Sequence, residues 1–146
     1  MSVSLEARVA ALEAERGARD AITRYARALD ACDLDEIAAL MAERVVFESG
    51  DVHLVGADQL LAHFAAVITG RAWAAHVVGA ICVEMGDDGS PVAEAPFIFL
   101  ARSGSALRVS AGRYHARFAA PAGGTLRFTN LRIEIGLNES RALPGA

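Results

Sequence analysis

The chain has 146 residues, which suits a single domain that buries about two thirds of the surface of its unfolded form. Its formal net charge of -4 argues against nucleic acid as a partner, because phosphate-backbone binding relies on clustered Lys and Arg. Hydrophobic residues make up 53% of the chain, more than one small core needs, so we expect a cavity or a subunit interface to absorb the excess.

The N-terminal segment has the periodicity of a long amphipathic helix. From residue 4 to about residue 32, apolar residues recur at steps of three and four, with Glu and Arg between them. The pattern places Leu5, Val9 and Leu12 on the apolar stripe. The segment is charged throughout and lacks the apolar core of a signal peptide, and no run approaches a membrane span. We therefore expect a soluble, cytoplasmic protein that is not inserted in a membrane.

Two further helices and two short strands are predicted before residue 70. Asp33, with Glu36 three residues later, resembles a capping box at the start of a short second helix. Residues 44–49 and 52–55 have the composition of two strands joined by a tight turn. A third helix is expected over about residues 58–68, because its apolar residues again follow helical spacing.

The second half of the chain predicts a sheet. Segments at about residues 74–85, 91–102, 107–119 and 125–136 are rich in Val, Ile, Phe and Tyr, and short turn-forming stretches separate them. Consecutive strands with short loops indicate an antiparallel meander. Helices that cover one face of such a sheet make an α+β domain. Residues 140–146 are expected to form a loose tail.

The two cysteines give no sign of a disulfide or a zinc site. Cys32 and Cys82 lie on separate predicted elements, without CxxC spacing and without a neighbouring His. We expect reduced, buried thiols, as is usual in a cytoplasmic protein.

Asp30 and His76 are the residues on which a chemical function depends. Asp30 directly follows Leu29 and borders the apolar stripe of its helix, while His76 enters an apolar strand with no neighbouring charge. Imidazole titrates near neutrality, and a buried carboxylate would fix its tautomer and stabilise its charged form. In the alternative interpretation Asp30 is a helix-terminal residue solvated or bonded to local amides, and His76 is a core histidine bonded to backbone.

Tyr25 is the third candidate. It precedes Asp30 by five residues, about 140° around an ideal helix, so both side chains can flank one cavity without stacking. Its hydroxyl could donate to a carbonyl or to a leaving hydroxyl, and simple packing is the alternative role.

The remaining polar residues carry less weight. His53, His63 and His115 lie at positions typical of solvated side chains, although Arg113 and His115 together could bind an acidic partner surface. The sequence contains no His-x-x-x-His pair, no GxSxG nucleophile motif and no Gly-rich phosphate loop. We therefore expect acid/base chemistry without a metal or a cofactor.

Several blocks of sequence resemble one family. Residues 18–64, then WAAHVVGAICVE at 73–84, SAGRYHARF at 110–118 and LRFTNLRIEI at 126–135 are similar in order and spacing to the SnoaL-like branch of the nuclear-transport-factor-2-like superfamily. This is the branch of scytalone dehydratase, bile-acid 7α-dehydratase and polyketide cyclase-like proteins. The resemblance covers about residues 15–136. It implies a cone-shaped α+β barrel, in which a curved antiparallel sheet and about three helices enclose a pocket.

The resemblance also implies a site. Dehydratases and a dehydrochlorinase of this branch eliminate water or HCl with an Asp-His pair, and Asp30 and His76 match its two members. Tyr25 matches a tyrosine that accompanies the pair. The strand segment PFIFLA lacks the further polar pocket residue, a second His or Asp, that some of these dehydratases carry.

The expected reaction is a lyase reaction on a small hydrophobic substrate, polycyclic or polyketide-like. His76 would take a proton from carbon next to a carbonyl, Asp30 would stabilise the imidazolium, and Tyr25 or His76 would assist departure of water. A polyketide cyclase or isomerase in the same pocket, or a non-catalytic binding or assembly module, are the alternatives. The aromatic residues expected to line the pocket, or else to form ordinary core, are Phe47, Phe64, Trp73, Phe97, Phe99 and Tyr114.

Self-association is expected as well. The excess of apolar residues and the outer face of a long sheet predict a homo-oligomer, and members of the family that this chain resembles form dimers or trimers.

Overall fold

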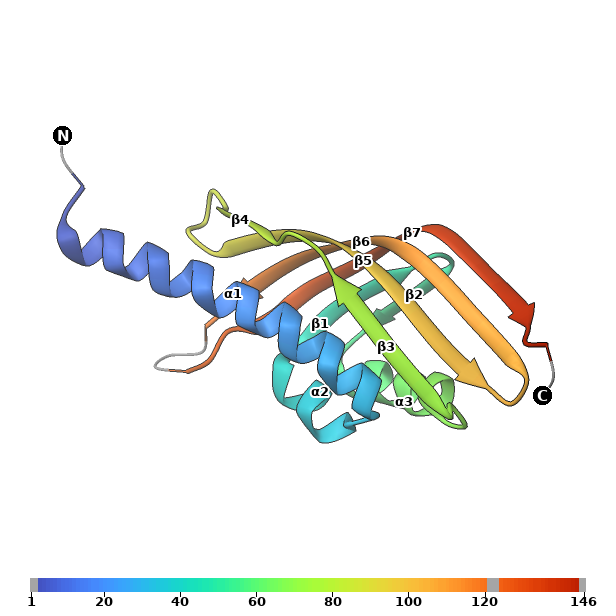
Figure 1. The fold of residues 1–146 in the computed structure, drawn as a ribbon. Coiled ribbons are helices and arrows are strands. Elements are labelled where there is room, and N and C mark those ends of the chain that lie inside the picture. The colour runs from blue at the N-terminus through green and yellow to red at the C-terminus, as the bar shows by residue number, and fades with distance from the viewer. Residues whose placement is uncertain (1–2, 121–123, 145–146) are drawn as a thin grey trace.

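Three helices cover one side of a curved, seven-stranded sheet in the computed structural model, which describes residues 3–120 and 124–144 (Figure 1). The predicted α+β architecture is confirmed. The elements follow one another as α1 (Leu5–Ala31), α2 (Leu34–Leu40), β1 (Met41–Ser49), β2 (Val52–Val55), α3 (Ala57–Ile68), β3 (Trp73–Val78), β4 (Cys82–Met85), β5 (Pro91–Ser103), β6 (Ala106–Ala119) and β7 (Arg127–Ala142).

The sheet is open and mixed. Its strand order is β2-β1-β7-β6-β5-β3, and β4 pairs with β5 outside this path. The meander β5-β6-β7 is antiparallel as predicted, whereas β1 pairs with β7 in parallel. The long strands bend over the helices, as Figure 1 shows, so that the inner face of the sheet and the helices enclose the middle of the molecule.

Strand β1 begins three residues earlier than predicted, at Met41, and the strands of the second half differ from the prediction in two places. The segment 74–85 forms two strands, because the chain leaves β5 after β3 and returns to it with β4. Gly79 lies at this break, where its N–H donates to the carbonyl of Pro96 at 2.8 Å and a Cβ would come within 2.8 Å of the Pro96 ring. Strand β7 continues to Ala142 because it pairs with the start of β6. Residues 140–142 are therefore sheet rather than tail, and residues 145–146 lie outside the described part of the chain.

The N-terminal half of α1 is more exposed than its pattern predicts. Leu5, Val9 and Leu12 are all exposed, and the buried residues of the helix begin at Ala18. Figure 1 shows that the first turns of α1 extend past the long strands of the sheet, and Leu12 has only the short strand β4 beside it. The apolar stripe therefore packs in the domain along the C-terminal half of the helix only.

Both cysteines are free, and both are exposed, so the expectation of buried thiols was wrong. Cys32 ends α1 in the left-handed conformation, φ 55°, with its amide bonded to carbonyls of the last turn. Cys82 begins the short strand β4. A helix end and a short outlying strand place each thiol beyond the packed core.

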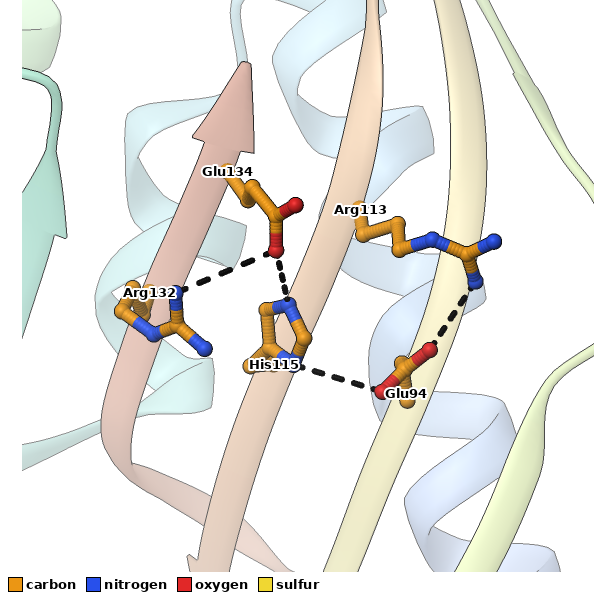
Figure 2. A network of polar contacts seen from close by, with 5 residues as sticks. All are labelled: Glu94, Arg113, His115, Arg132 and Glu134. Atoms are coloured by element: carbon orange, nitrogen blue, oxygen red, sulfur yellow. Dashed lines mark hydrogen bonds and ion pairs between the residues drawn. The ribbon is translucent and has the colours of Figure 1, made fainter. Parts of the chain in front are cut away.

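The outer face of the sheet carries a polar network (Figure 2). The two ring nitrogens of His115 lie 2.9 Å from a carboxylate oxygen of Glu134 and 3.4 Å from one of Glu94. Arg113 donates to Glu94 at 2.9 Å, and Arg132 lies 3.9 Å from Glu134. The hydrogen bond from His115 is the main reason that the pKa of Glu134 is lowered. Arg113 and His115 thus have acidic partners within their own sheet.

Gly112 is expected to be the least replaceable glycine of the sheet. It lies at a register shift between β6 and β7, where a Cβ would overlap the carbonyl oxygen of Glu134. Gly112→Ala should lower the free energy of unfolding by about 3 kcal/mol, because backbone on the neighbouring strand must move. Denaturant unfolding followed by circular dichroism measures the change.

Gly136 provides the matched control from the facing strand. A Cβ at Gly136 would meet the carbonyl oxygen of Ala111 at 3.7 Å, an ordinary contact. Gly136→Ala should therefore unfold within about 1 kcal/mol of the parent protein. Equal unfolding midpoints for the two variants would contradict the close approach at Gly112.

Candidate active site

Asp30 and His76 meet where α1 ends beside β3. Asp30 is in the last turn of α1, and His76 is in the middle of β3, opposite Phe99 of β5. The Oδ1 atom of Asp30 lies 2.6 Å from Nδ1 of His76, and Oδ2 accepts the backbone N–H of His76 at 2.8 Å. One carboxylate therefore holds both the ring and the backbone of the histidine.

This contact sets the tautomer of the imidazole. An ionised carboxylate can only accept, so Nδ1 of His76 carries the proton and Nε2 keeps a free lone pair when the ring is neutral. The side chain of His76 is 6% exposed and that of Asp30 is 24% exposed. Burial lowers the pKa of His76 from its ordinary 6.5, against the opposing effect of Asp30. At neutral pH the ring is thus an uncharged base.

A cavity of about 460 Å³ opens beside His76. Its wall combines α1, α3 and the inner face of the sheet, and it includes five of the six aromatic residues expected there: Phe47, Phe64, Phe97, Phe99 and Tyr114. The rings pack on one another. Phe97 stacks on Tyr114 with centroids 4.4 Å apart, and Phe99 lies 4.5 Å from the ring of His76.

Trp73 does not line this cavity. Successive side chains of a strand point to opposite faces, so Trp73 lies on the face opposite to His76, three residues later. It is 52% exposed. Trp73 was expected to line or close the pocket, but the alternation of side chains along β3 turns it away from the cavity.

Two tyrosine hydroxyls belong to the wall of the cavity. Tyr25 and Tyr114 both line it, and their rings meet edge to face at 5.8 Å. Neither buried hydroxyl has a hydrogen-bond partner in residues 3–120 and 124–144. Burial raises the pKa of both phenols, that of Tyr25 most strongly, so both stay protonated. The donor capacity of each hydroxyl is thus unused by the described residues.

Sequence patterns did not single out a set of polar residues in the wall. Ser110 has the same strand parity as Tyr114, a signal that could have identified it, and Asn138 lies on the part of β7 beyond the predicted end of that strand. Arg71 belongs to the short loop between α3 and β3, where no periodicity applies. The polar lining residues missed in this way are Ser49, Arg71, Arg108, Ser110 and Asn138, and His63 also lines the cavity although it was given little weight.

Neither a metal cluster nor a membrane helix is found in the described ranges. Residues 3–120 and 124–144 contain no group of three or more His, Cys, Asp and Glu that could hold a metal ion. In the same residues no helix is long and apolar enough to cross a membrane.

The curved open sheet, with helices over its concave side, is the cone fold of the nuclear-transport-factor-2-like superfamily. Within that class the chain belongs to the SnoaL-like domain family, which it matches over residues 10–132. No curated protein matches the chain.

Solved structures share this fold at low sequence identity. A putative scytalone dehydratase from Novosphingobium aromaticivorans is 17% identical, with a TM-score of 0.79 over 92% of this chain and 95% of the other. The hexachlorocyclohexane dehydrochlorinase LinA-type3 from Novosphingobium barchaimii is 13% identical, with a TM-score of 0.80 over 95% and 96%. ActVI-ORFA from Streptomyces coelicolor is 15% identical, with a TM-score of 0.73 over 84% and 96%.

Proposed function

We propose that this protein is a lyase of the dehydratase type, which needs no cofactor and acts on a small hydrophobic substrate, polycyclic or polyketide-like. The observation that supports this most strongly is the 2.6 Å contact between Asp30 and Nδ1 of His76 at the wall of an aromatic cavity. A neutral imidazole oriented by a carboxylate is a general base, and general bases remove protons from activated carbon.

The reaction follows from the arrangement of donors and the base. Nε2 of His76 takes a proton from the carbon next to a carbonyl group, and the C–H electron pair forms the enolate. A hydroxyl of Tyr25 or Tyr114 donates to the carbonyl oxygen as its negative charge develops. The enolate then reforms the carbonyl as the C–O bond of a neighbouring hydroxyl breaks. The departing hydroxide takes the proton from His76, so the products are an unsaturated ketone and water.

Asp30 makes both proton transfers easier. Its negative charge stabilises the imidazolium that exists between the first transfer and the second. Its hydrogen bond to Nδ1 keeps Nε2 as the basic nitrogen through the cycle. Two structural neighbours carry the names of elimination enzymes, a dehydratase and a dehydrochlorinase, which is consistent with this chemistry.

The same base also serves two related reactions. Isomerisation and aldol cyclisation both begin with removal of a proton next to a carbonyl. They differ from dehydration in the product, because isomerisation and the aldol step itself leave the molecular mass unchanged. A non-catalytic binding module needs neither the contact between Asp30 and His76 nor the orientation of the ring.

Product mass tests the proposal. The protein is incubated with a panel of β-hydroxylated cyclic ketones, and products are analysed by mass spectrometry. Dehydration gives a product that has lost one water, with a new conjugated chromophore. Products of unchanged mass would assign the protein to the isomerases or cyclases. Absence of any turnover across ketones that bind in the cavity would reject the lyase assignment.

We also propose that the protein is a homo-oligomer joined through the outer face of the sheet. Val77, Ile98, Ala111 and Leu137 are paired across β3, β5, β6 and β7, and the three large side chains are exposed. Ile98→Glu should therefore turn the assembly into a monomer, because it places a charge in the middle of this apolar row. Light scattering coupled to size-exclusion chromatography measures the mass.

Leu12→Glu is the control, since it adds the same charge at an exposed apolar position on the projecting part of α1. It should leave the mass of the assembly unchanged. A parent protein that is monomeric, or an Ile98→Glu variant with the parent mass, would contradict an interface on this face.

A further inference from the structure

Arg71 brings a positive charge to the cavity wall, and no carboxylate of the described residues forms an ion pair with it. Its guanidinium lies over the ring of Phe99, 4.9 Å from the centroid, and Phe99 also contacts the ring of His76. The buried Nη1 atom has no hydrogen-bond partner in the described ranges, and no carboxylate there lies within 4 Å of this side chain. A buried N–H without an acceptor is costly, so the site favours a ligand that supplies one.

A second arginine adds to the same charge. Arg108 also lines the cavity, and Nε of Arg108 donates to Oδ1 of Asn138 at 3.1 Å. Ser110 donates to the same oxygen at 2.9 Å. The oxygen of Asn138 is thus occupied, while its amide NH2 and the outer N–H groups of Arg108 have no acceptor within residues 3–120 and 124–144. Arg108 and Asn138 are both exposed, which places this cluster at the open mouth of the cavity.

The lining as a whole supplies donors and positive charge. None of the lining residues in the described part of the chain is Asp or Glu. Burial lowers the pKa of Arg71 most, and the charge of Arg108 also lowers it, against the opposing effects of Cys32 and Asp30. The two guanidinium groups therefore repel one another. An anion between them would remove this repulsion and fill the unmet donors. Guanidinium groups suit carboxylates, because their planar N–H pairs match two oxygens at once.

We infer that the cavity takes an organic acid, with its apolar body against Phe97 and Phe99 and its carboxylate held by Arg71 and Arg108. The inference rests on the proposed function, since it names the substrate class of the same site. It adds a specificity-determining role for two arginines that do not take part in proton transfer. The substrate is therefore a hydrophobic hydroxy-ketone that also bears a carboxylate, and the neutral ester or amide binds less well.

A pair of dyes of nearly equal shape tests the charge preference without turnover. 8-Anilinonaphthalene-1-sulfonate and N-phenyl-1-naphthylamine differ by one sulfonate, and both fluoresce in apolar cavities. The anionic dye should bind the parent protein about tenfold or more tightly than the neutral dye, the usual size of a charge-assisted contact. Naphthalene-1-carboxylate should displace it, and naphthalene-1-carboxamide should not.

Matched variants identify the residues that give the preference. Arg71→Met should remove most of the difference between the dyes, and Arg108→Met should reduce it. Arg16→Met is the control, because Arg16 lies on the exposed outer part of α1 and its loss changes the net charge equally. Circular dichroism checks that each variant is folded.

The outcomes separate this inference from the proposed function. Equal affinity for the two dyes, no binding of either dye, or an unchanged ratio in both Arg71→Met and Arg108→Met overturns the organic acid. The proposed lyase function would not be affected by that result, because it would still be supported by turnover of a neutral ketone. His76→Ala should lose turnover and keep the dye preference of the parent, because His76 carries no charge to the anion. A parent protein that prefers the anionic dye but turns over no ketone would overturn the lyase and leave the anion site in place.

Discussion

Replacing His76 with Ala is expected to lower turnover by about 10²–10⁴-fold, the usual contribution of a positioned general base. The variant loses the nitrogen that accepts the proton, whereas the aromatic wall and both tyrosine hydroxyls remain. Loss of water from a β-hydroxylated ketone, followed by mass spectrometry, measures the rate. Exchange of the substrate proton for deuterium in heavy water reports the first step separately, and it should fall by a similar factor.

His53→Ala is the control for removal of an imidazole. His53 lies on β2, outside the cavity, with its ring 3.3 Å from a carboxylate oxygen of Glu48. Its loss should leave turnover within about twofold of the parent, since a solvated surface ion pair contributes little to the stability of the fold. If His76→Ala retained the parent rate of deuterium exchange, another group would be the base and the mechanism would be wrong.

Asp30→Asn is expected to lower both the pKa of His76 and the rate. The carboxylate accepts from Nδ1 and from the backbone N–H of His76, and its charge opposes the effect of burial on the pKa of the ring. An amide removes the charge and has one acceptor oxygen, so one of these two donors loses its partner. If the amide NH2 faces Nδ1, the proton moves to Nε2, and the basic nitrogen no longer faces the substrate.

The pH dependence has a definite sign. The pKa of His76 is below 6.5 in the folded protein, so the unfolded chain binds an extra proton as pH falls below that value. Stability from this group is complete above pH 6.5 and is lost as pH falls toward the folded pKa. Asp30→Asn should extend the loss to lower pH. The acidic limb of the rate profile should likewise lie below pH 6.5 in the parent.

NMR titration of the imidazole ring measures this directly. The parent should titrate below 6.5, and Asp30→Asn should titrate lower still. Asp33→Asn is the control, because Asp33 caps α2 through the amide of Glu36 and does not contact the histidine. A pKa of His76 that rises in Asp30→Asn would contradict a stabilising effect of the Asp30 charge on the imidazolium.

The sequence predicted the elements well where the pattern is local. Helical spacing located α1, α2 and α3, and the turn-separated runs located the meander β5-β6-β7. The parallel pairing of β1 with β7 depends on residues more than 80 positions apart, as in Phe47 opposite Leu131. The periodicity of a local segment gives no information on pairing between strands that lie so far apart in the sequence. The exposed first turns of α1 show the same limit, because an apolar stripe does not reveal where the surface that would bury it ends.

Some residues of the candidate site could likewise be predicted from the sequence, and others could not. Asp30 and His76 could be named because an acid or an imidazole next to apolar residues is unusual, although their 2.6 Å separation could not be read from the sequence. The cavity arginines carry no comparable signal. Arg71 and Arg108 resemble the chain's solvated arginines in the sequence, and they differ from them through the three-dimensional placement of a loop and a strand end.

The strand order has one more implication for the chemistry. β3 is the border strand of the sheet path, so β5 supports it along one flank, while α1 lies beside it. On that side the carboxylate of Asp30 accepts a hydrogen bond from the backbone N–H of His76, as the carbonyl of a neighbouring strand would. The same carboxylate thus anchors the border of the sheet and orients the imidazole ring. A substitution that removed this carboxylate would therefore free the edge of the sheet and the imidazole at the same time.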